Sequence, residues 1–269
     1  MDTIRKTQII INSTILFVVA STLEMTLHEF GHFFAAIMVH AKGISIHHNY
    51  VSNVDDGISL QSLLFIKGAG PFISLLIGIL FQWICSHQTK RNMLFLFNLY
   101  MSAFGYIGFF GYLMIAPMFT GGDTGYICYA LGFPIWLTIS IALAGAVALF
   151  FLVNSLANYF VEMGSKEVIE NGETRSQFIQ LLLVYPIFIG IVITTALNFP
   201  IPVFLSLIAP ICSPFSFFWG YKNALTKIYS YDKANKEFES LNKLHFWLFF
   251  LLGITIIYNR LLVYGIFAN

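Results

Sequence analysis

Two histidines and a glutamate stand within five residues of one another, at His28, Glu29 and His32. Side chains four residues apart lie on the same face of a helix, one turn above each other, so both imidazoles can hold one metal ion. The glutamate between them then lies beside the metal and can act as a base, as in zinc hydrolases. The motif falls within an apolar stretch over residues 9–39, where ionisable side chains are costly and usually functional. The sequence therefore predicts a centre with one Zn²⁺ inside a membrane helix.

A third metal ligand must come from elsewhere in the chain, because catalytic zinc takes three protein ligands and leaves a fourth position for water. Asp123 is the first candidate, since it is an acidic residue in an apolar region and the glycines around it let the backbone approach closely. An Asp before a helix can also serve as an N-cap. Glu24 is the alternative ligand, because it precedes His28 by four residues and shares its helix face. Contact with an imidazole N–H or with a water-filled cavity is the favoured role of Glu24, because catalytic zinc usually draws one ligand from a different element.

Glu29 is the predicted catalytic residue. It would take a proton from zinc-bound water as the water attacks a carbonyl, and would pass that proton to the leaving amine. The alternative is a structural pair of core histidines with Glu29 as their counter-charge, which would be an expensive way to pack a membrane helix. Candidates for positioning the substrate are Asn98, Gly70, Pro71 and Thr124. For Asn98, a hydrogen bond between helices is the alternative role.

The composition is that of a membrane protein. Hydrophobic residues make up 58% of the 269 residues and charged residues only 10%, against about 25% in soluble domains. A net charge of +1, without a basic and aromatic stretch, excludes nucleic acid as a partner. The three cysteines are far apart in apolar surroundings, which predicts neither a disulfide framework nor a cysteine metal site. The expected surroundings are a lipid bilayer.

About seven segments are long and apolar enough to span a bilayer, which takes about 20 apolar residues each. They are 8–40, 69–86, 93–116, 134–157, 177–197, 200–220 and 244–267. The first segment follows Arg5 and Lys6, as the apolar part of a signal peptide would. It continues for about thirty residues, more than a signal peptide needs, and is therefore predicted to be an uncleaved membrane helix.

Two connections have unusual compositions. Residues 41–67 contain an alternating run at 44–51, followed by a turn at 54–57, which predicts a small β-hairpin at the membrane face. The connection 117–133 is rich in glycine, and broken backbone at such depth is tolerated only where it lines protein or a wet cavity. The predicted fold is an all-α polytopic membrane protein with a small β-hairpin or re-entrant segment next to the active site.

The chain divides into a zinc-binding catalytic core over residues 1–135 and about four additional transmembrane helices over 136–269, with polar loops at 162–176 and 221–243. In a seven-span arrangement most Lys and Arg residues fall on the side of the N-terminus. The positive-inside rule then predicts a cytoplasmic N-terminus. The histidine motif and Asp123 would face the extracytoplasmic leaflet.

Three motifs carry a resemblance to a known family. They are His28-Glu29-Phe30-Gly31-His32 in a membrane helix, Gly68-Ala69-Gly70-Pro71 opening the second span, and Gly121-Gly122-Asp123-Thr124-Gly125. With the β-like segment after the first motif, residues 20–135 resemble the site-2 protease family of intramembrane zinc metalloproteases. The resemblance implies a three-helix core in which His28, His32 and Asp123 bind zinc and Glu29 activates water. Family members typically carry Asn and Pro before the third ligand, whereas here Pro117 precedes Thr-Gly-Gly-Asp and no Asn stands close.

We therefore expect an intramembrane zinc metalloendopeptidase that hydrolyses peptide bonds of membrane-embedded or membrane-adjacent proteins or peptides. One alternative is a non-catalytic protein of the same fold that keeps the metal as a structural or sensing element. Another is a membrane zinc hydrolase or transferase acting on a lipid or a lipid-linked amide. A membrane di-iron oxygenase is excluded, because seven histidines are too few for the several histidine clusters that two irons require.

Overall fold

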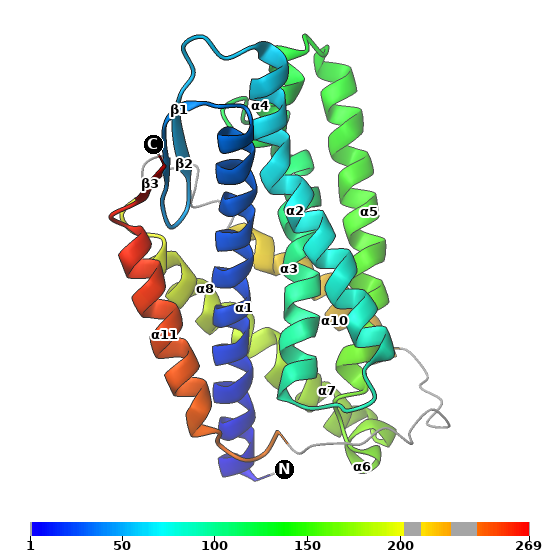
Figure 1. Ribbon diagram of the computed structural model, residues 1–269. Helices are drawn as coiled ribbons and strands as arrows, with labels where there is room; N and C mark the ends of the chain where they lie inside the picture. The colour runs from blue at the N-terminus through cyan, green and yellow to red at the C-terminus, as the bar shows by residue number, and fades with distance from the viewer. Residues whose placement is uncertain (1, 202–210, 227–240, 269) are drawn as a thin grey trace.

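The chain folds into a bundle of long helices with a small sheet at one end (Figure 1). The computed structural model describes residues 2–201, 211–226 and 241–268. In chain order the elements are α1 (Thr3–Met38), β1 (Lys42–Ile46), β2 (Val51–Val54), α2 (Leu60–His87), α3 (Met93–Ile115), α4 (Asp123–Ala130), α5 (Ile135–Val161), α6 (Lys166–Glu170), α7 (Gly172–Ile179), α8 (Tyr185–Leu197), α10 (Phe217–Thr226), α11 (Phe246–Leu262) and β3 (Ile266–Ala268). A π-helical turn, Gln180–Val184, joins α7 to α8, and a 3-10 turn, Ser213–Ser216, precedes α10.

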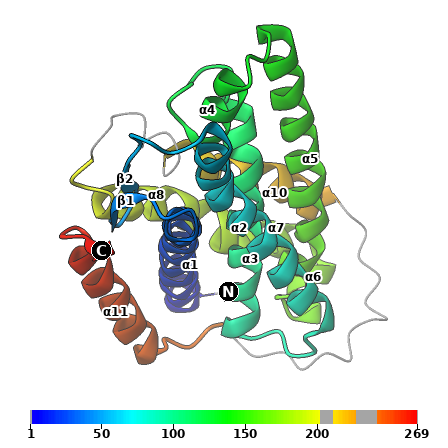
Figure 2. The same cartoon turned by 45° about the horizontal axis from the view of Figure 1, so that its top comes forward.

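The first helix, α1, is the central helix of the bundle. Its 36 residues extend over about 54 Å, well beyond the roughly 30 Å apolar core of a bilayer. Asp2 caps its N-terminus, where the carboxylate accepts a hydrogen bond from the backbone N–H of Arg5 (2.8 Å). The helix contacts α2, α3, α8 and α11, and Figure 2 shows it between α11 on one side and α2 on the other. Because protein surrounds α1 on several sides, its polar side chains are kept away from lipid.

Five helical segments are long and apolar enough to cross a membrane. They are α1, α2, α3, α5 and the continuous segment Gly172–Leu197, which comprises α7, the π-helical turn and α8. These segments match the first five predicted spans, although α2 begins at Leu60 rather than at residue 69. α11 is apolar but only 17 residues long. The chain is therefore a mostly helical membrane protein, while the predicted number of seven spans is not confirmed.

The predicted sixth span, 200–220, is not a single long helix in the part of the chain that the structure describes. Residues 202–210 lie outside the described residues, and after them come the 3-10 turn and α10. Pro214 stands in that turn and has no N–H to continue a helix. The predicted polar loop 162–176 also differs, because it contains α6 and the first part of α7. Of the loop predicted at 221–243, the described residues 221–226 belong to α10.

Aromatic rings pack α10 against the centre of the bundle. The ring of Phe217 lies 5.7 Å from the ring of Phe17 on α1 and 5.4 Å from that of Phe104 on α3. Phe17 also contacts Tyr100 of α3 edge to face, with ring centres 5.5 Å apart. Aromatic pairs of this kind stabilise by about 0.5–1.5 kcal/mol beyond their buried area. An apolar segment read as a membrane span thus serves in part as core.

A three-stranded sheet lies beside the C-terminal end of α1, with its strands in the order β2-β1-β3. β1 and β2 form the predicted antiparallel hairpin, which is closed by a hydrogen bond from the His47 N–H to the Tyr50 carbonyl (2.9 Å). The predicted run 44–51 is divided between the two strands, so the hairpin turn lies within the run. The turn predicted at 54–57 follows the hairpin and leads to α2.

The third strand, β3, comes from the C-terminal part of the chain and was absent from the predicted fold. It pairs antiparallel with β1, with Ile266 opposite Ile46. Three residues are too few to show the alternation that identifies a strand in a sequence. Ile44 and Ile46 pack with Phe33 of α1 in an apolar cluster. β3 covers one edge of β1, which leaves β2 as the edge strand on the other side of the sheet.

The tip of the hairpin is held at the C-terminal end of α8. His48 donates through Nε2 to the carbonyl of Asn198 (2.9 Å), and the amide of Asn49 donates to the same oxygen (3.0 Å). Arg260 of α11 donates to the next carbonyl, that of Phe199 (2.5 Å). The carbonyl of Asn198, the C-cap of α8, is one that a helix leaves unpaired at its end, and the two donors from the hairpin satisfy it. Burial lowers the pKa of His48, so its imidazole is neutral at pH 7. Because the carbonyl of Asn198 can only accept, the single ring proton lies on Nε2.

An ion pair closes the opposite end of the bundle. Arg91, only 1% exposed, follows α2, and its Nε donates to a carboxylate oxygen of Glu162 at the end of α5 (2.8 Å). The guanidinium also lies over the ring of Phe95, 4.0 Å from the ring centre. The N-terminus, the α2–α3 connection and α6 share this end, whereas the sheet and α4 lie at the other (Figure 1).

Candidate metal centre

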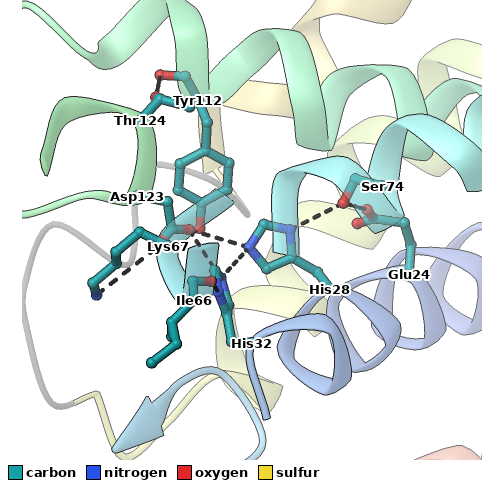
Figure 3. Close-up of polar contacts among 9 residues, drawn as sticks. All are labelled: Glu24, His28, His32, Ile66, Lys67, Ser74, Tyr112, Asp123 and Thr124. Atoms are coloured by element: carbon teal, nitrogen blue, oxygen red, sulfur yellow. Dashed lines mark hydrogen bonds and ion pairs between the residues drawn. The ribbon is translucent and has the colours of Figure 1, made fainter. Parts of the chain in front are cut away.

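Three ligand atoms converge at one point beside α2, two from α1 and one from α4 (Figure 3). His28 Nε2 and His32 Nε2 lie 3.1 Å apart, and each lies 3.2 Å from Asp123 Oδ2. All three side chains are buried. This group could hold a metal ion. The structure thus brings the predicted third ligand to the two histidines across more than ninety residues of sequence.

The other nitrogen of each imidazole is held by a hydrogen-bond acceptor. His32 Nδ1 donates to the backbone carbonyl of Ile66 (2.7 Å), which can only accept. His28 Nδ1 lies 2.9 Å from Ser74 Oγ, whose own proton goes to Glu24 Oε1 (2.5 Å), so Ser74 must accept from His28. Both Nδ1 atoms therefore carry protons, and in the neutral imidazoles both Nε2 atoms present lone pairs to the convergence point.

The donor set fits a divalent metal. Two imidazole lone pairs and a carboxylate oxygen repel one another at 3.1–3.2 Å unless a cation or a proton lies between them. Zinc, with ligand bonds of about 2.0–2.1 Å in a tetrahedron, separates its ligand atoms by about 3.3 Å. The observed triangle is close to one face of that tetrahedron. In a metal-free protein a shared proton would occupy this point, and a metal ion would displace it.

The space for a metal depends on glycine at two places. A Cβ at Gly70 of α2 would lie 2.2 Å from His32 Nε2 and 2.7 Å from His28 Nε2. A Cβ at Gly31 of α1 would lie 2.8 Å from the carbonyl oxygen of Ala69. Both distances are too short for a real Cβ, so only glycine lets α1 and α2 approach this closely beside the imidazoles.

Gly70 and Pro71, predicted to position a substrate, belong instead to the helix wall behind the ligands. Pro71 is buried inside α2 and gives no N–H to the carbonyl four residues earlier, that of Lys67. Ile66, whose carbonyl accepts the hydrogen bond from His32, directly precedes Lys67 in the same turn. Gly70 lets α2 approach the two imidazoles, and Pro71 is the buried residue that follows it in the helix.

Asp123 is the first residue of α4 and does not act as a helix cap. The N-cap position is Gly122, and no side chain caps the helix. Thr124, the other predicted substrate residue, donates through its hydroxyl to the carbonyl of Tyr112 in α3 (2.6 Å). A Cβ at Gly125 would lie 1.9 Å from the carbonyl oxygen of Phe119, so the glycine-rich turn is tight. Thr124 and Gly125 thus hold α4 against α3 and direct Asp123 toward the histidines.

A cavity of about 460 Å³ opens beside the ligands. Glu29 lines it, and no hydrogen bond to its carboxylate is found within the described residues. Lys67, Glu24 and Asp123 are its other charged lining residues, which gives three carboxylates and one ammonium group. A divalent cation would neutralise the excess of negative charge. Val51 and Asn53 of the edge strand β2 also line the cavity.

Glu24 and Asn98 lie in different places from the metal ligands. Glu24 lines the cavity but reaches His28 only through Ser74, and the group that could hold a metal does not include it. Asn98 donates to the side-chain oxygen of Gln88 (3.0 Å), close to the α2–α3 connection, and is not part of the cavity lining. The structure therefore supports the inter-helix role for Asn98, because its amide is used where α2 ends.

Three side chains around the ligands were not identified from the sequence. Tyr112 stacks on His28 with ring centres 5.0 Å apart, Lys67 Nζ lies 3.9 Å from Asp123 Oδ1, and Ser74 contacts His28. Ser74 follows Gly70 by four residues, and Lys67 precedes Gly70 by three. Both therefore lie on the helix face of Gly70, and this spacing could have identified them from the sequence. Tyr112 is one of many aromatic residues in an apolar segment and gave no such signal.

Comparisons of the chain with protein-family models, with curated proteins and with solved structures found no match. The resemblance to the site-2 protease family therefore stays a prediction that rests on the three sequence motifs.

Proposed function

We propose that this chain is an intramembrane zinc metalloprotease. The observation that carries the proposal is the convergence of His28 Nε2, His32 Nε2 and Asp123 Oδ2 at 3.1–3.2 Å, beside a cavity lined by a carboxylate without a hydrogen-bond partner in the described residues. Two imidazoles and one carboxylate are a common ligand set of hydrolytic zinc, which keeps a fourth position open. The same residues carry the proposed membership of the site-2 protease family.

The chemistry divides between the metal and Glu29. When bound, zinc would lower the pKa of a water molecule to about 7 and polarise the carbonyl that the water attacks. Glu29 follows His28 directly, and its carboxylate accepts the proton that water loses as its oxygen adds to the carbonyl carbon. Glu29 then gives this proton to the amide nitrogen while the carbon–nitrogen bond breaks. One water is consumed and two peptide ends, a carboxyl and an amine, are formed.

The substrate is proposed to bind as an extended segment along β2. A transmembrane helix hides its amides in its own hydrogen bonds, so it must unwind before a carbonyl can reach the centre. His47 and Tyr50 form a hydrogen-bonded pair, and pairs along an antiparallel hairpin alternate between hydrogen-bonded and non-hydrogen-bonded. The next pair, Ile46 and Val51, is therefore non-hydrogen-bonded, so the N–H and C=O of Val51 point away from β1. Among the described residues no strand pairs with this edge of β2, and an edge at the cavity favours a peptide over a lipid amide, because a peptide can add a strand to it.

The orientation is part of the proposal. The N-terminal end of the bundle carries Arg5, Lys6, Lys90, Arg91 and Lys166, whereas the end with the sheet carries Lys42, Lys67 and Arg260. By the positive-inside rule the N-terminus faces the cytoplasm and the metal centre faces the extracytoplasmic leaflet.

The decisive experiment compares the wild type with Glu29→Gln in full-length protein purified in detergent. We expect one zinc per chain in both, and peptide cleavage only in the wild type, because the amide cannot accept the proton. His32→Ala should lose both zinc and cleavage, since it removes a ligand. Full activity in Glu29→Gln would refute the proposed mechanism, and zinc binding without any cleavage by the wild type would favour a non-catalytic metal protein.

A further inference from the structure

We infer that Glu24 is a positioning residue that acts through Ser74 on His28 and sets how tightly the centre binds its metal. The inference rests on the proposed metal site, and it concerns two residues that are not themselves ligands. It assigns a task to a buried carboxylate that the hydrolytic step does not use.

The three side chains form a continuous chain of two hydrogen bonds. His28 Nδ1 donates to Ser74 Oγ (2.9 Å), and Ser74 Oγ donates to Glu24 Oε1 (2.5 Å), as Figure 3 shows. The single hydroxyl proton of Ser74 fixes the direction of both bonds, so the imidazole proton must lie on Nδ1. The chain therefore holds His28 in the tautomer that presents Nε2 to the metal.

The chain of contacts is built into the helix packing. Ser74 is fully buried and Glu24 is 8% exposed. A Cβ at Gly108 of α3 would lie 2.5 Å from Glu24 Oε1 and 2.7 Å from Ser74 Oγ, so α3 leaves room for these two atoms only because residue 108 is glycine. Burying a carboxylate in such a place is costly, and a hydrogen-bonded link to a metal ligand offsets that cost.

The two histidines differ in what supports them. His32 Nδ1 donates to a neutral backbone carbonyl, that of Ile66, whereas the chain from His28 ends on a carboxylate. A carboxylate linked to the imidazole N–H makes the imidazole a more basic ligand, and removal of such a partner typically weakens metal binding by about 10–100-fold. Glu24 thus acts on one ligand only.

The test measures the zinc affinity of full-length protein in detergent by competition with a zinc indicator. Glu24→Gln keeps an oxygen that accepts from Ser74 but removes the charge, and Ser74→Ala keeps the charge but removes the link. We expect each variant to bind zinc about 10–100-fold more weakly than the wild type. The double variant should bind zinc at most about threefold more weakly than the weaker of the two single variants. The two effects do not add because both changes break the same chain of contacts.

Two glycine variants on α3 supply the matched control. Gly108→Ala should weaken zinc binding as Ser74→Ala does, because its methyl group displaces Glu24 or Ser74 without changing any charge. Gly111→Ala, whose Cβ would meet nothing nearer than 4.0 Å, should bind zinc as the wild type does. The visible spectrum of the Co²⁺-loaded protein should shift in Glu24→Gln, Ser74→Ala and Gly108→Ala but not in Gly111→Ala. A shifted spectrum reports a changed ligand environment, whereas a smaller folded fraction would only lower its intensity.

A wild-type affinity in Ser74→Ala would overturn the inference, even if Glu24→Gln weakened binding, because the effect would then be a through-space effect of charge. Multiplicative losses in the double variant would overturn it as well. Both results are compatible with the proposed protease function, provided that the wild type binds one zinc. Failure of the wild type to bind zinc would instead remove the metal site itself, and with it the proposed function.

Discussion

Gly70 determines how close α2 can come to the imidazoles of His28 and His32. Its missing side chain would otherwise fill the position where both Nε2 atoms point. The residue therefore belongs to the metal centre although it offers no ligand atom. A sequence motif with glycine beside a proline is usually interpreted as a turn, but here it lies inside α2.

Gly70→Ala should weaken zinc binding by at least about 100-fold, because its methyl group would overlap both imidazoles. Gly68→Ala is the matched control on the same helix, since its Cβ would meet nothing nearer than Ile127 at 3.8 Å. Zinc content after dialysis, with helix content measured by circular dichroism, checks the prediction. Equal zinc content in the two variants would contradict the prediction, because it would show that α2 moves enough to accommodate the methyl group.

The three residues that could hold a metal ion were predictable as a group because their chemistry is rare in an apolar chain. Two histidines four residues apart and one Asp among glycines stand out in a sequence with only 10% charged residues. What surrounds them was harder to predict, since Ser74 and Tyr112 are ordinary residues of membrane helices. Their importance follows from contacts between α1, α2 and α3, which a single sequence does not contain.

The edge strand β2 is the element through which the fold would hold a substrate. Val51→Pro removes an N–H from the edge of β2 that faces away from β1, whereas Val51→Ala keeps that N–H and removes only side-chain atoms. We expect Val51→Pro to lower cleavage by up to about tenfold relative to Val51→Ala, the effect of one lost hydrogen bond. Both variants should retain one zinc per chain.

The measurement is the cleavage rate of a fluorescent transmembrane peptide at low substrate concentration. If Val51→Pro cleaves the peptide as fast as Val51→Ala does, substrate does not pair with this edge of the sheet.

The ion pair between Arg91 and Glu162 joins the α2–α3 connection to α5. Arg91→Met should lower the free energy of unfolding by about 3 kcal/mol, because it leaves a largely buried carboxylate without its guanidinium partner. The double variant Arg91→Met/Glu162→Met should recover much of this loss, since the largely buried carboxylate is removed together with the guanidinium. Equilibrium unfolding in mixed micelles provides the measurement, and a double variant less stable than Arg91→Met would contradict the explanation.

Long helices were the most predictable elements. A sustained apolar run identifies α1, α3 and α5 almost to their ends, because about 20 apolar residues in succession have few other uses. The same reasoning is not confirmed for 200–220, because residues 202–210 lie outside the described residues and the apolar Phe217 packs inside the bundle. Hydrophobicity does not distinguish a surface that faces lipid from one that faces protein.

The two ends of the bundle differ in charge, and this difference bears on how the chain lies in a membrane. Basic residues belong mostly to the end with the N-terminus, while the sheet and the metal centre are nearer the other end. The number of crossings was less predictable, because α11 is shorter than a typical span and residues 202–210 lie outside the described residues.

The proposed sidedness predicts which ends of the chain a membrane-impermeant maleimide can label. In a protein whose native cysteines are replaced, Asp56→Cys near the sheet should be labelled in intact cells. Asp2→Cys at the N-terminus should be labelled only after the membrane is opened. Both aspartates are exposed, so access across the membrane decides the result. The reverse pattern would place the metal centre on the cytoplasmic side.

The pairing of β1 with β3 has a consequence for the order in which the protein is made. Ile46 leaves the ribosome about 220 residues before its partner Ile266. At about 5–20 residues per second, this delay is on the order of 10–40 s. During that time the hairpin exists with both of its edges open, and one of them is covered only after β3 has been made. A nascent chain would thus carry its metal ligands long before it has the finished sheet beside them.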